Sequence, residues 1–255
     1  MASKRVVDAR ARERIQSIYR RKSSKWVYRF IRWGIVLVLF PYFRLRCKGA
    51  ENLNLNIAGP VIVAPIHRSN FDAPLVAGIA LRPLRFLAKE QLFSNPVLAW
   101  LFASLGSFPV RREVTDRHAL RISEDTLRAG KQLLVFPEGS RQSGPKVKGV
   151  FDGVGYLASR TGAPVIPIGI AGTEKVMRSG GRLPARPTVA IVVGNPFYPP
   201  KDRMSKFELK QFSDTLHQRL QVVFDEAQQL TEDFLNDDLR TRGSAQNPSN
   251  SRRRR

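Results

Sequence analysis

The residues of this 255-residue chain best suited to chemistry are His67 and Asp72, which begin and end the segment HRSNFD. An apolar run over residues 61–66 precedes the histidine, and a second apolar segment begins at Ala73. This pattern predicts a buried strand, a polar turn and the start of a helix. In that geometry the Asp72 carboxylate accepts a hydrogen bond from one ring nitrogen of His67, and the other nitrogen is free to take a proton. The segment therefore predicts a general base and its orienting carboxylate.

A less specific interpretation of the same segment is also open. Asp72 would then only favour the helix dipole, and His67 would be an ordinary loop residue. In either case Ser69 or Asn70 is expected to cap the helix, with Asp72 and Pro74 in its first turn. The other polar turns of the chain favour the chemical interpretation.

Three polar turns each follow a short apolar strand: HRSNFD after residues 61–66, Arg111-Arg112 after residues 108–110, and EGSR after residues 133–136. If these strands are neighbours in a sheet, the turns converge at one edge, where an open α/β sheet binds its ligands. In the EGSR turn, Glu138 supplies a carboxylate and Gly139 lets the backbone approach a ligand.

The basic residues near these turns predict a phosphate-binding pocket, because arginine holds phosphate through two parallel hydrogen bonds and lysine holds it as a point charge. The alternative, ordinary surface charge, is favoured for Arg112 and Lys146 and less so for residues directly after apolar strands. The residues expected in the pocket are Arg111, Arg141, Lys146 and Lys148.

Strands that alternate with helices predict an α/β domain with a mixed, largely parallel central sheet flanked by helices, preceded by an N-terminal interfacial helical segment. Further strands are expected over residues 84–88, 132–136, 164–170 and 189–193, and helices over residues 96–105, 115–129 and 150–160 and from Ser205 onward. The expected organisation is basic amphipathic membrane-docking helices over residues 1–47, the α/β domain over 48–230, and a polar, Arg-rich disordered tail over 231–255.

A formal net charge of +22 implies an anionic partner, such as membrane headgroups, nucleic acid or a phosphorylated substrate. The single cysteine, Cys47, excludes an internal disulfide framework and a cysteine zinc site, and the three histidines lack metal-ligand spacing. A reducing cytoplasmic setting fits this cysteine usage. The chain also lacks the Gly-x-Ser-x-Gly elbow of α/β hydrolases, the Gly-Lys-Ser/Thr ending of a phosphate loop and a G-x-G-x-x-G motif after a strand.

Residues 1–30 are densely basic, and an uninterrupted apolar stretch follows over residues 33–43. This stretch is too short for a spanning helix, which needs about 20 residues. Aromatic residues at its edges and basic residues around it favour an interfacial helix on an anionic membrane surface. The alternative is a helical cap that packs on the domain, and one helix could do both.

The segments HRSNFD, GSFPVR, FPEGSR and VIPIGI, in this order, resemble the four signature blocks of the glycerolipid acyltransferase family, over about residues 48–200. The resemblance implies that His67 is the general base and Asp72 its orienter. It implies that Arg111 helps to hold the acceptor phosphate and that the third block, Glu138, Gly139, Ser140 and Arg141, binds the acceptor. The fourth block, residues 165–167, would line the acyl or structural side. Ser140 stands where Thr is common, and Pro109-Val110 where Ile-Asp or similar is often seen.

The family includes 1-acyl-sn-glycerol-3-phosphate acyltransferases, so the resemblance implies acyl transfer from acyl-CoA or acyl carrier protein to a lysophospholipid acceptor, giving phosphatidic acid. No metal or further cofactor is expected, and the enzyme would lie on the cytoplasmic face of the membrane, peripheral or monotopic. Backbone N–H groups of residues 68–72 are candidates for the oxyanion donors. Glycerol 3-phosphate, a lyso-phospholipid or a lyso-glycolipid remain alternative acceptors. Nucleic-acid binding is a distant alternative, because the basic residues cluster at the termini and no nucleic-acid motif is present.

Overall fold

The computed structural model of the chain describes residues 24–55, 59–89, 93–95, 99–100, 106–110, 117–175 and 187–245. Most of the helix expected over residues 96–105 lies outside these residues, as do Arg111, Arg112 and the two chain ends. The described part includes the complete HRSNFD and EGSR turns together with the strands that precede them.

Within the described residues, seven strands form one sheet in the order β1-β7-β6-β2-β5-β3-β4. All neighbouring pairs are parallel except β6 and β7, which confirms the predicted mixed, largely parallel sheet. Both β2 and β6 are buried along their whole length, which explains why their sequences are continuous apolar runs. The strands are β1 (Arg46–Lys48), β2 (Val61–Pro65), β3 (Leu84–Lys89), β4 (Ser107–Val110), β5 (Gln132–Leu134), β6 (Val165–Ala171) and β7 (Ala190–Val193).

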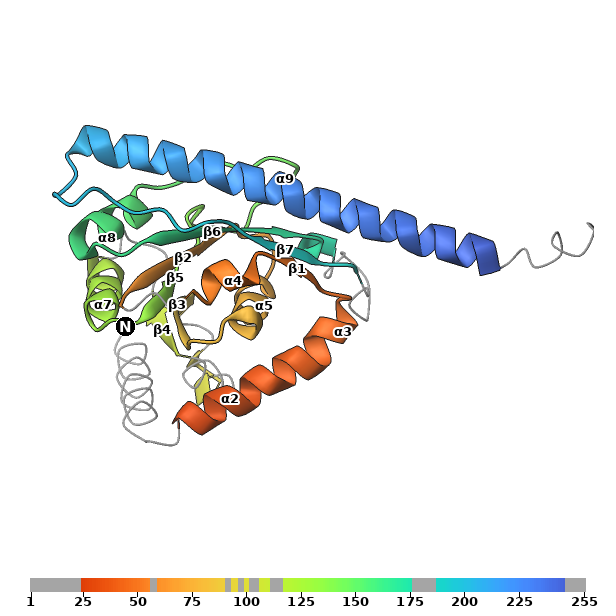
Figure 1. The fold of residues 1–255 in the computed structure, drawn as a ribbon. Helices are drawn as coiled ribbons and strands as arrows, with labels where there is room; N and C mark the ends of the chain where they lie inside the picture. Colours follow the sequence, from red (N-terminus) through yellow and green to blue (C-terminus); the bar gives the residue numbers. More distant parts are fainter. Residues whose placement is uncertain are drawn as a thin grey trace, which may run out of the picture.

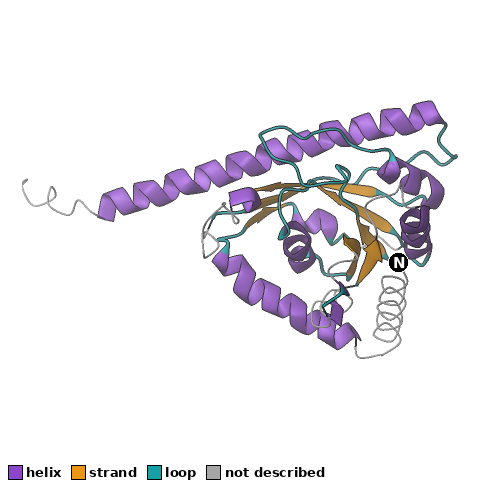
Figure 2. Ribbon diagram, turned by 180° about the vertical axis from the view of Figure 1, so that it is seen from behind, coloured by secondary structure: helices purple, strands orange, loops and turns teal. Residues whose placement is uncertain are grey.

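Helices cover both faces of the sheet. The long helix α9 (Lys206–Ala245) lies along one face, over β6 and β7, and α5 (Asp72–Ile79) lies against the other (Figures 1 and 2). Gly169 of β6 makes the close approach of α9 possible, because a Cβ there would stand 2.1 Å from the carbonyl oxygen of Val223. The other elements of the domain are α4 (Ala50–Leu53), α7 (Arg117–Arg128), α8 (Gly153–Thr161) and the 3₁₀ turn η3 (Thr173–Lys175).

The expected N-terminal helical segment is present as α2 (Ser24–Gly34), a π-helical turn η1 (Ile35–Leu39) and α3 (Phe40–Tyr42). It packs against α5, with Tyr28 and Ile35 buried in the contact region. Gly78 of α5 leaves the necessary space, because a Cβ there would lie 2.7 Å from the ring of Phe40. The segment is therefore an integral cap on the domain, as the alternative interpretation of the sequence proposed.

Two predicted boundaries are wrong. The sheet begins at Arg46, before the expected boundary at residue 48, because a three-residue edge strand pairs with β7. At the other end, α9 continues to Ala245, so residues 231–245 are helical rather than a disordered tail. Contacts with the N-terminal part of the chain support this extension: Arg44 forms an ion pair with Asp238 at 2.8 Å.

Candidate active site

His67 and Asp72 meet at the carboxyl end of β2, where the chain turns into α5. The Nδ1 atom of His67 lies 3.0 Å from Oδ2 of Asp72. The His67 side chain is 7% exposed and that of Asp72 is fully buried. The predicted contact is thus confirmed. Because a carboxylate only accepts hydrogen bonds, Nδ1 of His67 carries the proton in this pair, and Nε2 is left as the basic nitrogen.

The Asp72 carboxylate also organises the turn. Its Oδ2 atom accepts hydrogen bonds from the backbone N–H groups of Arg68 at 2.6 Å and Ser69 at 2.7 Å. Asp72 lies in the first turn of α5 as predicted, but the predicted cap at Ser69 or Asn70 is wrong. The N-cap position is Phe71, which makes no side-chain capping bond. The Asp72 carboxylate folds back onto the turn instead. The same carboxylate oxygen therefore holds both the turn and the imidazole of the His67–Asp72 dyad.

A residue that the sequence analysis missed completes the carboxylate's hydrogen bonds. The hydroxyl of Thr173, in η3, donates to Oδ1 of Asp72 at 2.8 Å and is fully buried. Thr173 follows the end of β6, the immediate neighbour of β2, so the strand-end argument used for the other turns would have found it. The fourth signature block itself is buried inside β6 and has a structural position.

The EGSR turn holds the histidine from the other side. Oε2 of Glu138 accepts a hydrogen bond from the backbone N–H of His67 at 2.7 Å, and the carbonyl of His67 accepts one from the N–H of Gln142 at 2.8 Å. The ring of Phe136 stacks on the imidazole, with centroids 3.9 Å apart and an angle of 18°. Glu138 was expected to contact substrate. Its buried carboxylate holds the backbone of His67, and its contact with the acceptor stays a prediction.

Arg68 is a second residue that the sequence analysis missed. Its buried guanidinium donates to the carbonyls of Gly144 and Lys146, both at 3.2 Å. It also lies 4.4 Å from the ring centroid of Phe224 in α9 and 4.0 Å from the Glu138 carboxylate. Arg68 therefore connects the dyad turn (residues 67–72), the basic loop (residues 140–148) and α9. Nothing in the sequence distinguishes this arginine from a surface residue.

The predicted phosphate-binding side chains are exposed. Arg141 and Lys148 have no carboxylate partner among the described residues, and Lys146 is exposed as well. Ser140 is also exposed, and its hydroxyl accepts a hydrogen bond from the side chain of Gln142 at 2.9 Å. Arg111, predicted to complete the pocket, lies outside the described residues.

Gly139 has a φ of +67°, and a Cβ there would stand 3.0 Å from the ring of Phe151. Glycine adopts this left-handed conformation without strain. The turn thus needs a glycine at this position.

The backbone N–H groups of residues 68–72 are mostly occupied. Those of Arg68 and Ser69 donate to Asp72, that of Phe71 donates to the Ser69 hydroxyl at 3.4 Å, and that of Asp72 donates to the Ser69 carbonyl at 3.4 Å. Of the oxyanion donors expected in this turn, the N–H of Asn70 is the one without an acceptor in the described part of the chain.

Other reactive groups stand apart from this centre. Partial desolvation, together with the nearby Glu51 carboxylate, raises the pKa of the exposed Cys47 thiol to about 11, so this thiol is protonated at neutral pH. Where the chain is described, no group of three or more His, Cys, Asp or Glu side chains is arranged to hold a metal ion.

The N-terminal segment carries an exposed apolar stripe on the side away from its packed residues. The stripe consists of five side chains, each more than half exposed: Trp26, Phe30, Trp33, Leu37 and Val38. The spacing of the first four follows one face of a helix. In the described residues, no helix is both long enough and apolar enough to cross a bilayer.

Residues 44–171, just over half of the chain, match the Acyltransferase family. The chain belongs to this family. The matched region includes the dyad, the EGSR turn and β6, so the family assignment covers the site described above.

Three relatives illustrate the similarity. The chain is 27% identical to a chloroplastic 1-acyl-sn-glycerol-3-phosphate acyltransferase, BAT2 of Brassica napus, over 71% of this chain and 52% of the relative. It is 29% identical to a 1-acyl-sn-glycerol-3-phosphate acyltransferase of Streptococcus pneumoniae, over 85% and 78%. The crystal structure of the 1-acyl-sn-glycerophosphate acyltransferase PlsC from Thermotoga maritima matches with a TM-score of 0.65 and 26% identity, over 84% and 85%. The chain spans about half the length of the plant and algal relatives it matches.

Proposed function

We propose that this acyltransferase-family protein transfers a fatty acyl group from an acyl thioester to the free hydroxyl of 1-acyl-glycerol 3-phosphate, giving phosphatidic acid. The observation that carries the proposal is the buried His67–Asp72 pair, whose carboxylate accepts four hydrogen bonds. The relatives named as 1-acyl-sn-glycerol-3-phosphate acyltransferases support the choice of acceptor.

The reaction follows from the state of the imidazole. Nε2 of His67 removes the proton of the glycerol hydroxyl as the oxygen attacks the thioester carbonyl, and Asp72 stabilises the imidazolium that forms. The tetrahedral intermediate then collapses: the carbon–sulfur bond breaks, and the thiolate leaves and takes the proton from His67. The ester and the free thiol are the products, and no covalent acyl-enzyme is required. The N–H of Asn70 is our candidate donor to the oxyanion.

We assign the acceptor phosphate to the basic loop, residues 140–148, which begins within the EGSR turn. Arg141 and Lys148 are exposed cations on this loop, and the residue after Arg141 donates its N–H to the His67 carbonyl. A phosphate held there would lie near the dyad, as the acceptor requires, because its phosphate is esterified to the carbon next to the one that bears the attacking hydroxyl. Arg111, which lies outside the described residues, is proposed to contribute a further contact to the phosphate.

The N-terminal segment is proposed to dock on an anionic membrane, at the cytoplasmic face. Its exposed aromatic and aliphatic stripe would enter the headgroup region, and basic residues around it would add about 1 kcal/mol each near an anionic surface. Because Tyr28 and Ile35 pack into the domain, deleting the segment would also expose core surface. A triple substitution of Trp26, Phe30 and Trp33 by Ser is the cleaner test. It should abolish flotation with liposomes and leave the melting temperature unchanged, and undiminished flotation would contradict this docking surface.

The decisive test of substrate identity is an acceptor panel with the purified protein in mixed micelles. It compares 1-acyl-glycerol 3-phosphate with glycerol 3-phosphate, a lyso-phospholipid and a lyso-glycolipid, each with acyl-CoA and with acyl carrier protein as donor. We expect the highest kcat/KM for 1-acyl-glycerol 3-phosphate. A clear preference for another acceptor, with the same dependence on His67, would overturn the substrate and retain the chemistry.

A further inference from the structure

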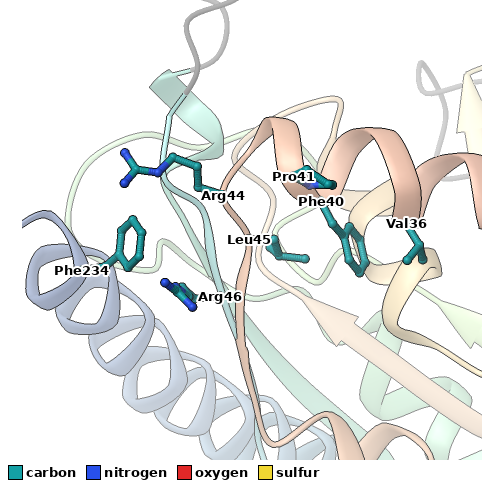
Figure 3. A pocket seen from close by; sticks show the side chains of 7 residues that line it. All are labelled: Val36, Phe40, Pro41, Arg44, Leu45, Arg46 and Phe234. Carbon is teal, nitrogen blue, oxygen red and sulfur yellow. The ribbon is translucent and has the colours of Figure 1, made fainter. Parts of the chain in front are cut away.

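A pocket of about 430 Å³ opens where the N-terminal helical segment joins the edge strand β1 and meets the far part of α9 (Figure 3). Its apolar side is formed by Val36, Phe40, Pro41 and Leu45. On the other side lie two arginines and an aromatic ring, Arg44, Arg46 and Phe234, which Figure 3 shows with one guanidinium on each side of the ring. The pocket thus combines an apolar wall with concentrated positive charge.

One of the two arginines has a carboxylate partner and the other has none among the described residues. Their guanidinium carbons lie 4.6 Å (Arg44) and 4.1 Å (Arg46) from the centroid of the Phe234 ring. Arg44 is paired with Asp238, whereas Arg46 has no carboxylate within ion-pair distance in the described part of the chain. None of the residues that line the pocket is acidic. An anion placed here would be attracted to one uncompensated charge and one compensated guanidinium.

The backbone at this corner is fixed in an unusual conformation. Arg44 has a φ of +46°, the one positive φ among the described non-glycine residues. Its N–H donates to the carbonyl of Pro41 at 3.2 Å, and that of Arg46 donates to the carbonyl of Val189 at 2.9 Å. Positive φ is costly for a residue with a Cβ and marks positions that the surrounding structure must hold in place. At this corner both arginines lie against the Phe234 ring.

We propose that this pocket binds the phosphate headgroup of an anionic phospholipid of the bilayer on which the protein lies. The guanidinium of Arg46 would hold the phosphate, Arg44 on the other side of the ring would attract it at longer range, and the glyceryl and first acyl carbons would lie against Val36, Phe40 and Pro41. The pocket is at the end of the same segment that carries the exposed stripe, so a bilayer lipid is the occupant within reach. This inference rests on the membrane-docking part of the proposed function and does not depend on acyl transfer.

The test compares Arg46→Gln with Arg29→Gln. Arg29 is a matched control, because it is an exposed arginine of the same segment that lies 5.2 Å from the centroid of the Trp26 ring and lines no part of this pocket. Partition is measured by flotation with vesicles of phosphatidylcholine alone and with added phosphatidylglycerol. We expect Arg46→Gln to weaken binding to the anionic vesicles about tenfold or more, as for a charged hydrogen-bonded pair. Arg29→Gln should cost no more than about fivefold, as diffuse attraction predicts, and Arg46→Lys should fall between them.

Equal losses for Arg46→Gln and Arg29→Gln would show diffuse charge attraction and overturn the pocket. A second arm titrates inorganic phosphate into the protein without vesicles. Saturable binding that depends on Arg46 and matches the vesicle affinity would assign the pocket to free phosphate and overturn the lipid assignment. In micelles, Arg46→Gln should retain wild-type acyl transfer. The inactive His67→Ala variant should still bind anionic vesicles more strongly than phosphatidylcholine vesicles, and adding Arg46→Gln should reduce that preference. This result would support the pocket independently of the catalytic proposal.

Discussion

The dyad turn, residues 67–72, and the basic loop, residues 140–148, are in contact but are built in opposite ways. In the turn, both oxygens of Asp72 and most backbone N–H groups have partners inside the protein. In the loop, Arg141 and Lys148 extend into solvent, although the buried guanidinium of Arg68 fixes the backbone beneath them. Proton transfer needs one fixed geometry, whereas binding a phosphate needs free donors on a fixed backbone. The difference separates turnover from acceptor affinity, and substitutions in each region can test that separation.

The largest effect is expected in the turn, for Asp72→Asn. The amide would present N–H groups to the donors that now reach the carboxylate, so the tautomer and orientation of His67 would be lost. We expect kcat to fall by about 10²–10⁴-fold, the usual worth of general-base assistance. The control is Asp152→Asn, at the N-cap of α8, which should retain activity. Turnover close to wild type in Asp72→Asn would remove the carboxylate from the mechanism.

A smaller effect in the same turn is expected for Thr173→Val, which keeps the shape of the side chain and removes its hydroxyl. The lost hydrogen bond to a buried charge is worth about 1.5–3 kcal/mol, so kcat should fall about tenfold or more with KM unchanged. Thr173→Ser should restore most of the rate. Thr188→Val is the matched control, because the Thr188 hydroxyl is buried and makes no hydrogen bond with the described residues. If both valine variants behaved alike, Thr173 would not position Asp72.

The smallest effect belongs to the loop, for Arg141→Ala. Removing one exposed phosphate contact should raise the KM for the acceptor about tenfold, as expected for a charged hydrogen bond. It should change kcat little and leave the melting temperature unchanged, because the side chain is exposed. Lys131→Ala, which removes an exposed cation before β5, controls for net charge. An unchanged KM together with a large fall in kcat would contradict the division between turn and loop.

The sequence predicted the parts of the site that depend on local pattern. His67 follows a continuous apolar strand and Asp72 begins a helix, so the strand-end argument predicted their contact. The alternation of strands and helices predicted the confirmed sheet class. Arg141, Lys146 and Lys148 were predicted from their place in and after the EGSR turn, and their phosphate-binding role stays a prediction. Each of these features is readable within about ten residues of sequence.

The parts that could not be predicted depend on contacts between distant residues. The hydrogen bond from Thr173 to Asp72 joins positions 101 residues apart, and that from His67 to Glu138 joins positions 71 apart. Charged side chains are ordinarily expected at the surface, but Glu138 and Arg68 are buried. In that position they hold the dyad and the basic loop in place. The predicted end of α9 came too early for a similar reason. The polar end of this helix is stabilised partly by contacts with Arg44 and Arg46, which are distant in the sequence.

Because the imidazole of His67 is proposed to take the proton of the acceptor, the rate of phosphatidic acid formation by His67→Ala tests the mechanism directly. His67→Gln accompanies it, because its amide can keep a hydrogen bond to Asp72 without acting as a base. Both variants should lose about 10²–10⁴-fold in kcat and retain wild-type binding to anionic vesicles. A folded His67→Ala variant that forms phosphatidic acid at close to the wild-type rate would contradict the account.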